Sequence, residues 1–174
     1  MKKQINIQTK DNKSLYGYVW EPESYDKVIV LTHGMAEHID RYEYFANRLN
    51  DNGFLVIGYN QRGHKYTSSK EDYGFMGDCD NFKILVSDLS DVIKYAKTNY
   101  PNKKYYTFGH SMGSFVNNRF LETFESENKI EKCVLCGTGR MPLLILSLGA
   151  FCCSIIKLFK GNWFKLAGSA ARKF

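Results

Sequence analysis

The first twenty residues alternate between apolar and polar positions. Ile5 and Ile7 share one face of the segment 4–9, and a polar turn separates it from a second alternating segment at 15–20. A period of two is that of a half-buried strand, so the pattern predicts a β-hairpin. Further along the chain, short runs of consecutive apolar residues are typical of strands buried on both faces. Four such runs lie at 28–31, 54–59, 105–108 and 133–136.

Between these runs, apolar residues recur at helical spacing. They predict helices over 42–49, 82–96 and 115–124. Gly53 closes the first of these helices, and the second stops before Pro101. Buried strands that alternate with helices predict an α/β fold. We expect a mostly parallel sheet with flanking helices, right-handed crossovers and the N-terminal β-hairpin.

Length and composition fit one folded domain. The 174 residues are 44% hydrophobic and 24% charged, which is ordinary for a soluble protein with a core. Met1-Lys2-Lys3 is followed by Gln4-Ile5-Asn6-Ile7-Gln8, which is not the apolar stretch of a secretion signal. Its five cysteines are an odd number, so we expect reduced thiols and a cytoplasmic location.

The last quarter of the chain differs in character. Residues 132–174 hold seven lysines and arginines and no acidic residue, whereas the net charge of the whole chain is +6. Within this part, 141–159 is apolar with a single charge, Lys157, and is interrupted by Pro142 and Gly149. Its length is near the lower limit for a membrane span. We expect instead a helical flap over an active site, with peripheral contact to an anionic membrane as a further possibility. Alternatively, the lysines and arginines of 132–174 could pair with acidic groups that lie outside the 174 residues.

Cys133-x-x-Cys136 has the spacing of a zinc or redox pair. On a strand, however, side chains three residues apart point to opposite faces, and the sequence has no second pair or nearby histidine. We therefore expect both cysteines to be small buried hydrophobic residues. We expect no metal or organic cofactor, because histidine, cysteine and aspartate do not cluster along the chain. The lysines are not combined with aromatic residues in a recognisable nucleic-acid motif, so we expect no nucleic-acid partner.

The segment Gly109-His110-Ser111-Met112-Gly113 lies between a predicted strand and a predicted helix. A sharp turn there would expose the Ser111 hydroxyl at the carboxyl end of the sheet, and glycines two residues either side would relieve its crowding. The Met112 N–H, at the start of the helix, could then stabilise an oxyanion. The pattern predicts a serine nucleophile; the alternative is an ordinary strand–helix turn.

His33-Gly34-Met35 follows the apolar run 28–31. An oxyanion hole needs a second N–H from the neighbouring strand–helix loop. Gly34 would allow that loop to come close, which makes the Met35 N–H the natural donor. We interpret His33 as a structural support of this loop rather than as a catalytic base.

Together these segments resemble the α/β-hydrolase superfamily. More narrowly, they are similar to its monoacylglycerol lipase and lysophospholipase branch, also described as serine aminopeptidase-like. That branch shows H-G-x-G-E-H-x-x-R-Y, D-x-R-G-H-G-x-S and G-H-S-M-G-G, which match residues 33–42, 60–65 and 109–114. Four positions depart from these patterns: Ala36, Lys65 and Ser114 stand for glycine, and Asn60 stands for aspartate.

The resemblance covers about residues 10–140. It implies that 1–139 is the N-terminal part of the hydrolase core, incomplete at its C-terminus, and that 140–174 begins an apolar cap. It also implies cleavage of carboxylic esters of small lipid-like substrates, such as a monoacylglycerol or lysophospholipid, through an acyl-enzyme. Its site residues would be Ser111 as nucleophile, the Met35 and Met112 N–H groups as oxyanion donors, and His33, Gly34, Gly109, His110 and Gly113 in support.

In this superfamily the triad acid and then the histidine follow the serine. After Ser111 the chain contains no histidine and no aspartate, and its four histidines at 33, 38, 64 and 110 have structural explanations. Without a base the serine is a poor nucleophile, so we expect these 174 residues alone to be inactive. An aminopeptidase on the same fold remains open, as does a non-catalytic module that binds a partner or a membrane.

Overall fold

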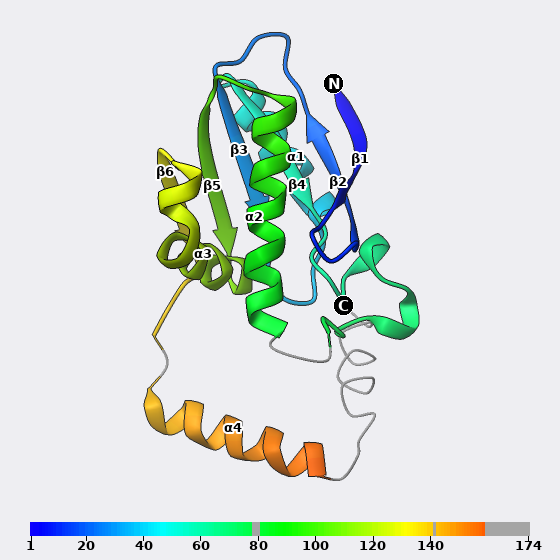
Figure 1. Ribbon diagram of the computed structural model, residues 1–174, viewed down its shortest axis with the longest axis vertical. Coiled ribbons are helices and arrows are strands. Elements are labelled where there is room, and N and C mark those ends of the chain that lie inside the picture. Colours follow the sequence, from blue (N-terminus) through cyan, green and yellow to red (C-terminus); the bar gives the residue numbers. More distant parts are fainter. Residues whose placement is uncertain (78–80, 141, 159–174) are drawn as a thin grey trace.

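The computed structural model describes residues 1–77, 81–140 and 142–158. Within them, six strands form one mixed sheet in the order β1-β2-β4-β3-β5-β6 (Figure 1). The pairs β1–β2 and β2–β4 are antiparallel, whereas β3–β4, β3–β5 and β5–β6 are parallel. The strands are β1 (Lys2–Gln8), β2 (Ser14–Trp20), β3 (Lys27–Thr32), β4 (Phe54–Tyr59), β5 (Lys104–His110) and β6 (Lys132–Cys136).

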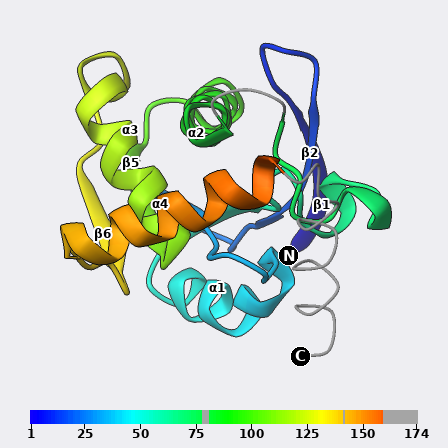
Figure 2. The same ribbon diagram turned by 90° about the horizontal axis from the view of Figure 1, so that it is seen from below.

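Helices cover both faces of this sheet. Helices α2 and α3 lie on one face and α1 on the other, while α4 crosses beyond the end of the sheet (Figure 2). Their bounds are α1 (Glu43–Asn50), α2 (Asn81–Asn99), α3 (Met112–Asn128) and α4 (Leu143–Leu158). The α/β fold with an N-terminal hairpin is therefore confirmed, and the predicted strands and helices all form.

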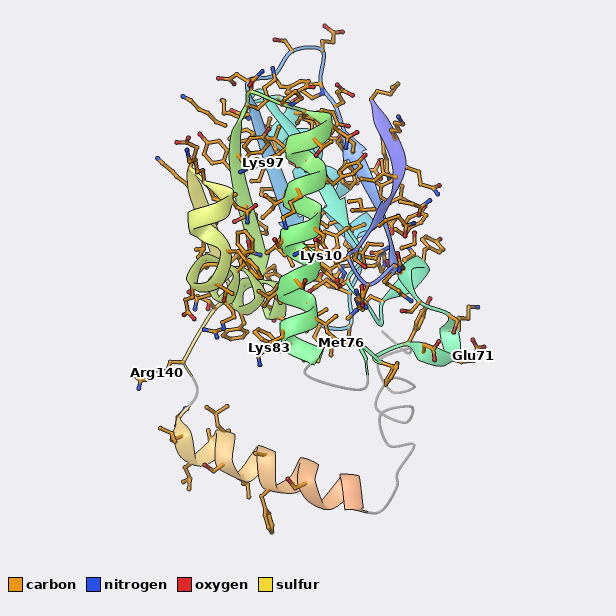
Figure 3. The ribbon with its side chains drawn as sticks, viewed as in Figure 1. Lys10, Glu71, Met76, Lys83, Lys97 and Arg140 are labelled. Carbon is orange, nitrogen blue, oxygen red and sulfur yellow. The ribbon has the colours of Figure 1, made fainter. Side chains whose placement is uncertain are left out.

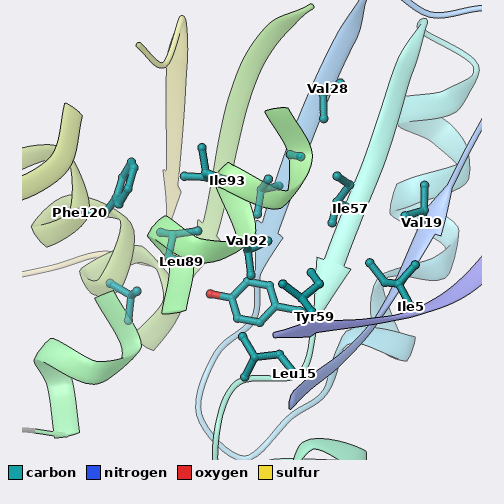
Figure 4. Packing of buried hydrophobic residues seen from close by; sticks show 14 of the residues in the cluster. Ile5, Leu15, Val19, Val28, Ile57, Tyr59, Leu89, Val92, Ile93 and Phe120 are labelled. Atoms are coloured by element: carbon teal, nitrogen blue, oxygen red, sulfur yellow. The ribbon is translucent and has the colours of Figure 1, made fainter. Parts of the chain in front are cut away.

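The core consists of two apolar layers, one on each face of the sheet. Alternate residues of β3 serve different layers: Val28 and Val30 face α2 and α3, while Ile29 and Leu31 face α1. This is why the strand reads as a continuous apolar run. Figure 4 shows the larger layer, in which Leu89, Val92 and Ile93 of α2 pack with Ile57, Tyr59 and Phe120.

The sheet is less buried towards β6 than its sequence predicts. Val134 is 52% exposed, Cys136 is exposed and Cys133 is only half-buried. The prediction that 133–136 is buried on both faces is wrong, and so is the prediction that both cysteines are buried. The physical reason is position: among the described residues β6 pairs with β5 alone and forms the edge of the sheet. Cys133 and Cys136 are free thiols.

Helix α4 confirms a helical segment in the predicted range 141–159. The helix stands apart from the core, and Arg140 lies between the two (Figure 3). In the part of the chain that the structure describes, no helix combines the length and apolar character needed to cross a membrane. The last part of the predicted cap, 159–174, lies outside the described residues. Six apolar side chains of α4 are more than half exposed: Leu143, Leu144, Ile145, Leu146, Leu148 and Phe151.

A buried ion cluster attaches the N-terminal hairpin to the rest of the fold. Arg62, just after β4, donates two hydrogen bonds of 2.7 Å to the Asp88 carboxylate on α2. It donates two more, of 2.7 and 2.5 Å, to Asp11 in the hairpin turn. The Arg62 side chain is 11% exposed and that of Asp88 only 2%. Figure 3 shows Lys10 of the same turn beside α2, where its N–H donates to Asp91 at 2.9 Å.

Removing the Arg62 charge should therefore destabilise the protein strongly. We expect Arg62→Ala to lower the free energy of unfolding by about 3 kcal/mol or more, because it leaves Asp88 buried without its partner. Arg48→Ala is the matched control, since Arg48 pairs with Asp51 at 3.1 Å on the surface and should cost at most about 1 kcal/mol. Urea unfolding of both variants measures the difference. Equal losses in the two variants would contradict the role given to the cluster.

Candidate active site

Ser111 lies in a strained turn between β5 and α3. Its φ angle is +50°, in the left-handed region that residues other than glycine rarely adopt. Three hydrogen bonds hold this conformation. The Ser111 N–H donates to the Cys136 carbonyl at 2.8 Å, and the Ser114 N–H and hydroxyl both donate to the Ser111 carbonyl, at 2.9 and 2.6 Å. Strain that the surroundings stabilise in this way is typical of functional turns.

The two glycines beside the turn are required by close backbone contacts. A Cβ atom on Gly113 would lie 2.2 Å from the Thr32 carbonyl oxygen, and one on Gly109 would lie 2.3 Å from the Gly113 carbonyl oxygen. Real Cβ atoms do not approach other atoms this closely, so only glycine fits at either position without displacing backbone. The first turn of α3 is thereby packed against the end of β3. The loop that follows β3 is brought to Ser111 as a result.

The loop 33–36 meets the turn at Gly34. A Cβ atom on Gly34 would lie 3.1 Å from the Cβ of Ser111. Two amides of the loop are already bonded: the Gly34 N–H donates to Glu37 at 2.5 Å, and the Ala36 N–H donates to His64 at 3.3 Å. Between them, the Met35 N–H has no partner within the described residues.

Met112 carries the other backbone N–H that the sequence predicts as an oxyanion donor. It is the first residue of α3, where no preceding turn of helix can accept its N–H. Within the described residues this N–H also has no hydrogen-bond partner. The structure therefore brings the loop of Met35 next to the turn that carries Ser111 and Met112, with both amides unused.

His33 has both of its ring nitrogens engaged. Its Nδ1–H donates to the Gly34 carbonyl at 2.7 Å, and its Nε2 accepts the Gln61 N–H at 3.0 Å. The ring is fully buried and packs edge-on against His64, with 4.9 Å between the ring centres. Burial lowers the pKa of His33 to about 3, and it also lowers that of His64. A neutral ring without a free nitrogen suits a support of the loop and not a base.

The remaining histidines are engaged as well. His38 lies 3.0 Å through its Nδ1 from Asp40, and His110 lies 3.0 Å through its Nδ1 from Glu37. The hydroxyl of Ser111 forms no hydrogen bond within the described residues, so none of these histidines is hydrogen-bonded to it there. The same residues contain no group of three side chains that could hold a metal ion.

Sequence reasoning missed Glu37. The motif at 33–42 includes Glu37 without indicating a role for it. In the structure its carboxylate is nearly buried and accepts hydrogen bonds from the Gly34 N–H, from His110 and from the Tyr42 hydroxyl. A carboxylate three residues after Gly34 was the available signal. The contact with His110 spans 73 residues of sequence and could not be read from spacing.

Gly113→Ala tests the close packing of the turn. The added methyl group has no space beside Thr32, so we expect the free energy of unfolding to fall by roughly 1–3 kcal/mol. Gly139→Ala is the control, because a Cβ atom there meets nothing within 4 Å and should change stability by less than about 0.5 kcal/mol. Thermal or urea unfolding provides the measurement, and a Gly113→Ala protein as stable as the control would contradict the packing argument.

His33 should make the fold sensitive to mild acid. Its pKa lies below the ordinary value of 6.5 in the folded chain, so the unfolded chain binds the proton more readily. Above pH 6.5 the ring is neutral in both the folded and the unfolded chain, and the protein has its full stability. As the pH falls from 6.5 towards 3, only the unfolded chain takes up the proton, so the free energy of unfolding decreases. The slope from this group is at most about 1.4 kcal/mol per pH unit.

Urea unfolding at pH 7.5, 6.5 and 5.5 measures this loss. We expect the midpoint to fall at the lowest pH while the ¹⁵N shift of His33 Nε2 in the folded protein remains that of an unprotonated nitrogen. Protonation of His33 in the folded state at pH 5.5 would disprove the assignment.

A protein family and several known lipases are similar to this chain in sequence. A protein-family model described as "Serine aminopeptidase, S33" matches residues 23–156. A monoglyceride lipase homolog of Monkeypox virus is 30% identical over 107 residues, which are 61% of this chain and 37% of that protein. A monoacylglycerol lipase of Mycolicibacterium smegmatis is 34% identical over 99 residues, which are 56% of this chain and 34% of that protein. The chain thus spans about a third of the length of these relatives.

A solved structure of an esterase has the same fold as this chain. A thermostable carboxyl esterase from Bacillus coagulans, in complex with glycerol, superposes with a TM-score of 0.77 at 26% identity. The match covers 90% of this chain and 51% of the esterase.

Proposed function

Because this chain belongs to the serine aminopeptidase S33 family of the α/β-hydrolases, we propose that it carries the nucleophile side of a serine hydrolase for carboxylic esters of lipid-like molecules. A monoacylglycerol or a lysophospholipid is the substrate class that we favour. The observation that supports this most is the strained Ser111 beside a loop whose Met35 N–H has no partner within the described residues. The lipase and esterase names among the relatives point the same way.

In the proposed reaction the Ser111 hydroxyl oxygen attacks the ester carbonyl carbon. The carbonyl oxygen becomes an oxyanion, which the N–H groups of Met35 and Met112 stabilise by hydrogen bonds. Collapse of this intermediate breaks the ester C–O bond and leaves the acyl group on Ser111. The proton lost from the Ser111 hydroxyl passes through a base to the leaving oxygen, which departs as the alcohol. Water then hydrolyses the acyl-enzyme, which releases the carboxylic acid and restores the Ser111 hydroxyl. His33, Gly34, Gly109, His110 and Gly113 support this geometry without taking part in bond changes.

Full activity also needs a base and an acid. After Ser111 these 174 residues contain neither histidine nor aspartate, and none of the histidines before it is hydrogen-bonded to the serine hydroxyl within the described residues. For full activity a histidine and an acid must therefore reach Ser111 from outside these residues. By themselves the 174 residues should hydrolyse esters on the order of 10⁴-fold or more slowly than an intact triad.

We assign residues 1–139 to the hydrolase core and 140–174 to an apolar cap that receives the acyl chain. In support, α4 lies beyond the carboxyl end of the parallel strands, the same end that carries Ser111 (Figures 1 and 2). The exposed leucines and Phe151 of α4 are chemically suited to an acyl chain or to the surface of a membrane.

The same exposed helix favours a second candidate function. A non-catalytic module that attaches to a membrane through α4 would need no base at Ser111. Sedimentation with vesicles that survives high salt, without Ser111-dependent hydrolysis, would support it, because salt weakens only electrostatic attachment. An amide substrate, as the family description suggests, is distinguished by activity on aminoacyl anilides.

Hydrolysis of p-nitrophenyl butyrate and of a monoacylglycerol tests the proposal in the protein expressed from its complete gene. We expect Ser111→Ala to lower kcat roughly 10⁴-fold, because it removes the nucleophile. Ser24→Ala, an exposed serine before β3, should leave kcat unchanged. The proposal fails if Ser111→Ala keeps wild-type activity, or if the wild-type protein cleaves anilides and not esters.

A further inference from the structure

One carboxylate oxygen of Glu37 accepts hydrogen bonds from three separate parts of the site. The Gly34 N–H donates to Oε1 at 2.5 Å, the Tyr42 hydroxyl at 2.9 Å and His110 Nδ1–H at 3.0 Å. These donors come from the loop after β3, from the short helix Ile39–Tyr42 and from the last residue of β5. Glu37 therefore joins three segments that are distant in sequence.

The charge and burial of Glu37 fit this contact. Its side chain is only 9% exposed, and burial by itself would raise its pKa. The donors from His110, Gly34 and Tyr42 lower the pKa overall, so the carboxylate is ionised at neutral pH. Hydrogen bonds to an ionised acceptor are shorter and stronger than those to a neutral one. The fourth neighbour, Arg41, lies 3.4 Å from Oε2 with a side chain that is 64% exposed.

Two of the Glu37 contacts lie at residues directly beside Ser111. Gly34 lies against the Cβ of Ser111, and His110 precedes Ser111 directly. The Gly34 N–H is occupied by its bond to Glu37, whereas the next amide, that of Met35, has no partner in the described residues. Bonding His110 to the same oxygen fixes the turn relative to the loop.

We propose that Glu37 is a positioning residue that clamps the loop 33–36 to the nucleophile turn and so holds the Met35 N–H and the Ser111 hydroxyl in a fixed relative position. The catalytic consequence rests on the proposed function, whereas the clamp itself does not. Loss of the clamp should affect stabilisation of the transition state more than binding of the substrate, because the oxyanion exists only during the reaction.

Steady-state kinetics with p-nitrophenyl butyrate test the consequence in the protein expressed from its complete gene. We expect Glu37→Ala to lower kcat about 10- to 100-fold while KM changes less than about 3-fold, since small displacements of catalytic groups have effects of this size. Glu37→Gln keeps an acceptor oxygen without the charge and should recover kcat to within about 10-fold of wild type. Arg41→Gln removes only the exposed neighbour and is the matched control, with less than a 2-fold change.

A double-mutant cycle tests whether Glu37 acts through the turn. If it does, the combination of Glu37→Ala with His110→Ala should be no slower than the slower single variant, because each change breaks the same clamp. Multiplied losses in the double variant would show independent roles and overturn the proposal. Should Glu37→Ala fail to fold, Glu37→Gln takes its place in the cycle.

Amide hydrogen exchange of Gly34, followed by NMR, tests the clamp without any substrate. We expect exchange to be at least about 10-fold faster in Glu37→Ala and unchanged in Arg41→Gln. If the wild-type protein hydrolyses no ester but Gly34 exchange depends on Glu37, the proposed function fails and the clamp stands. If hydrolysis depends on Ser111 but Glu37→Ala changes neither kcat nor Gly34 exchange, the inference fails alone. A changed exchange rate with unchanged kcat overturns the positioning role.

Discussion

The contact between the first turn of α3 and the end of β3 is the constraint on which the rest of the site depends. Backbone atoms approach so closely there that a side chain at Gly113 would overlap the Thr32 carbonyl. The contact places the carboxyl end of β3 beside the turn after β5, and the loop 33–36 can then reach Ser111. The left-handed conformation of Ser111 is sustained by this packing and by the hydrogen bonds from Ser114 and to Cys136.

Polar groups around this contact are largely satisfied by one another. His33 braces the loop with both ring nitrogens, His64 accepts from Ala36, and Glu37 accepts from three donors. Buried polar groups that bond one another in this way make the loop rigid. Among the described residues, the amides of Met35 and Met112 and the hydroxyl of Ser111 are without hydrogen-bond partners.

Two other parts of the molecule, the Arg62 cluster and helix α4, have opposite characters. The Arg62 cluster attaches the N-terminal hairpin to α2 through the nearly buried charges of Arg62 and Asp88 and the more exposed carboxylate of Asp11. Helix α4 has the opposite character, since its apolar side chains are exposed and it stands apart from the sheet (Figure 1). The sheet and its packed helices thus hold Ser111 in a closely packed turn, while the exposed apolar surface lies on a separate helix.

The sequence by itself determined which segments of the chain form strands and which form helices. A period of two or a continuous apolar run indicates a strand, and a period of 3.6 indicates a helix, because each reflects which faces are buried. The sequence also pointed to Ser111, because the two flanking glycines lie between a strand pattern and a helix pattern, although the contact that requires Gly113 is with the distant residue Thr32. Only the tertiary structure decided the role of Glu37, whose partners Gly34 and His110 lie on different segments, and which loop amide stays unbonded. It also decided that Cys136 is exposed, because burial depends on what covers an edge strand and not on the composition of the strand.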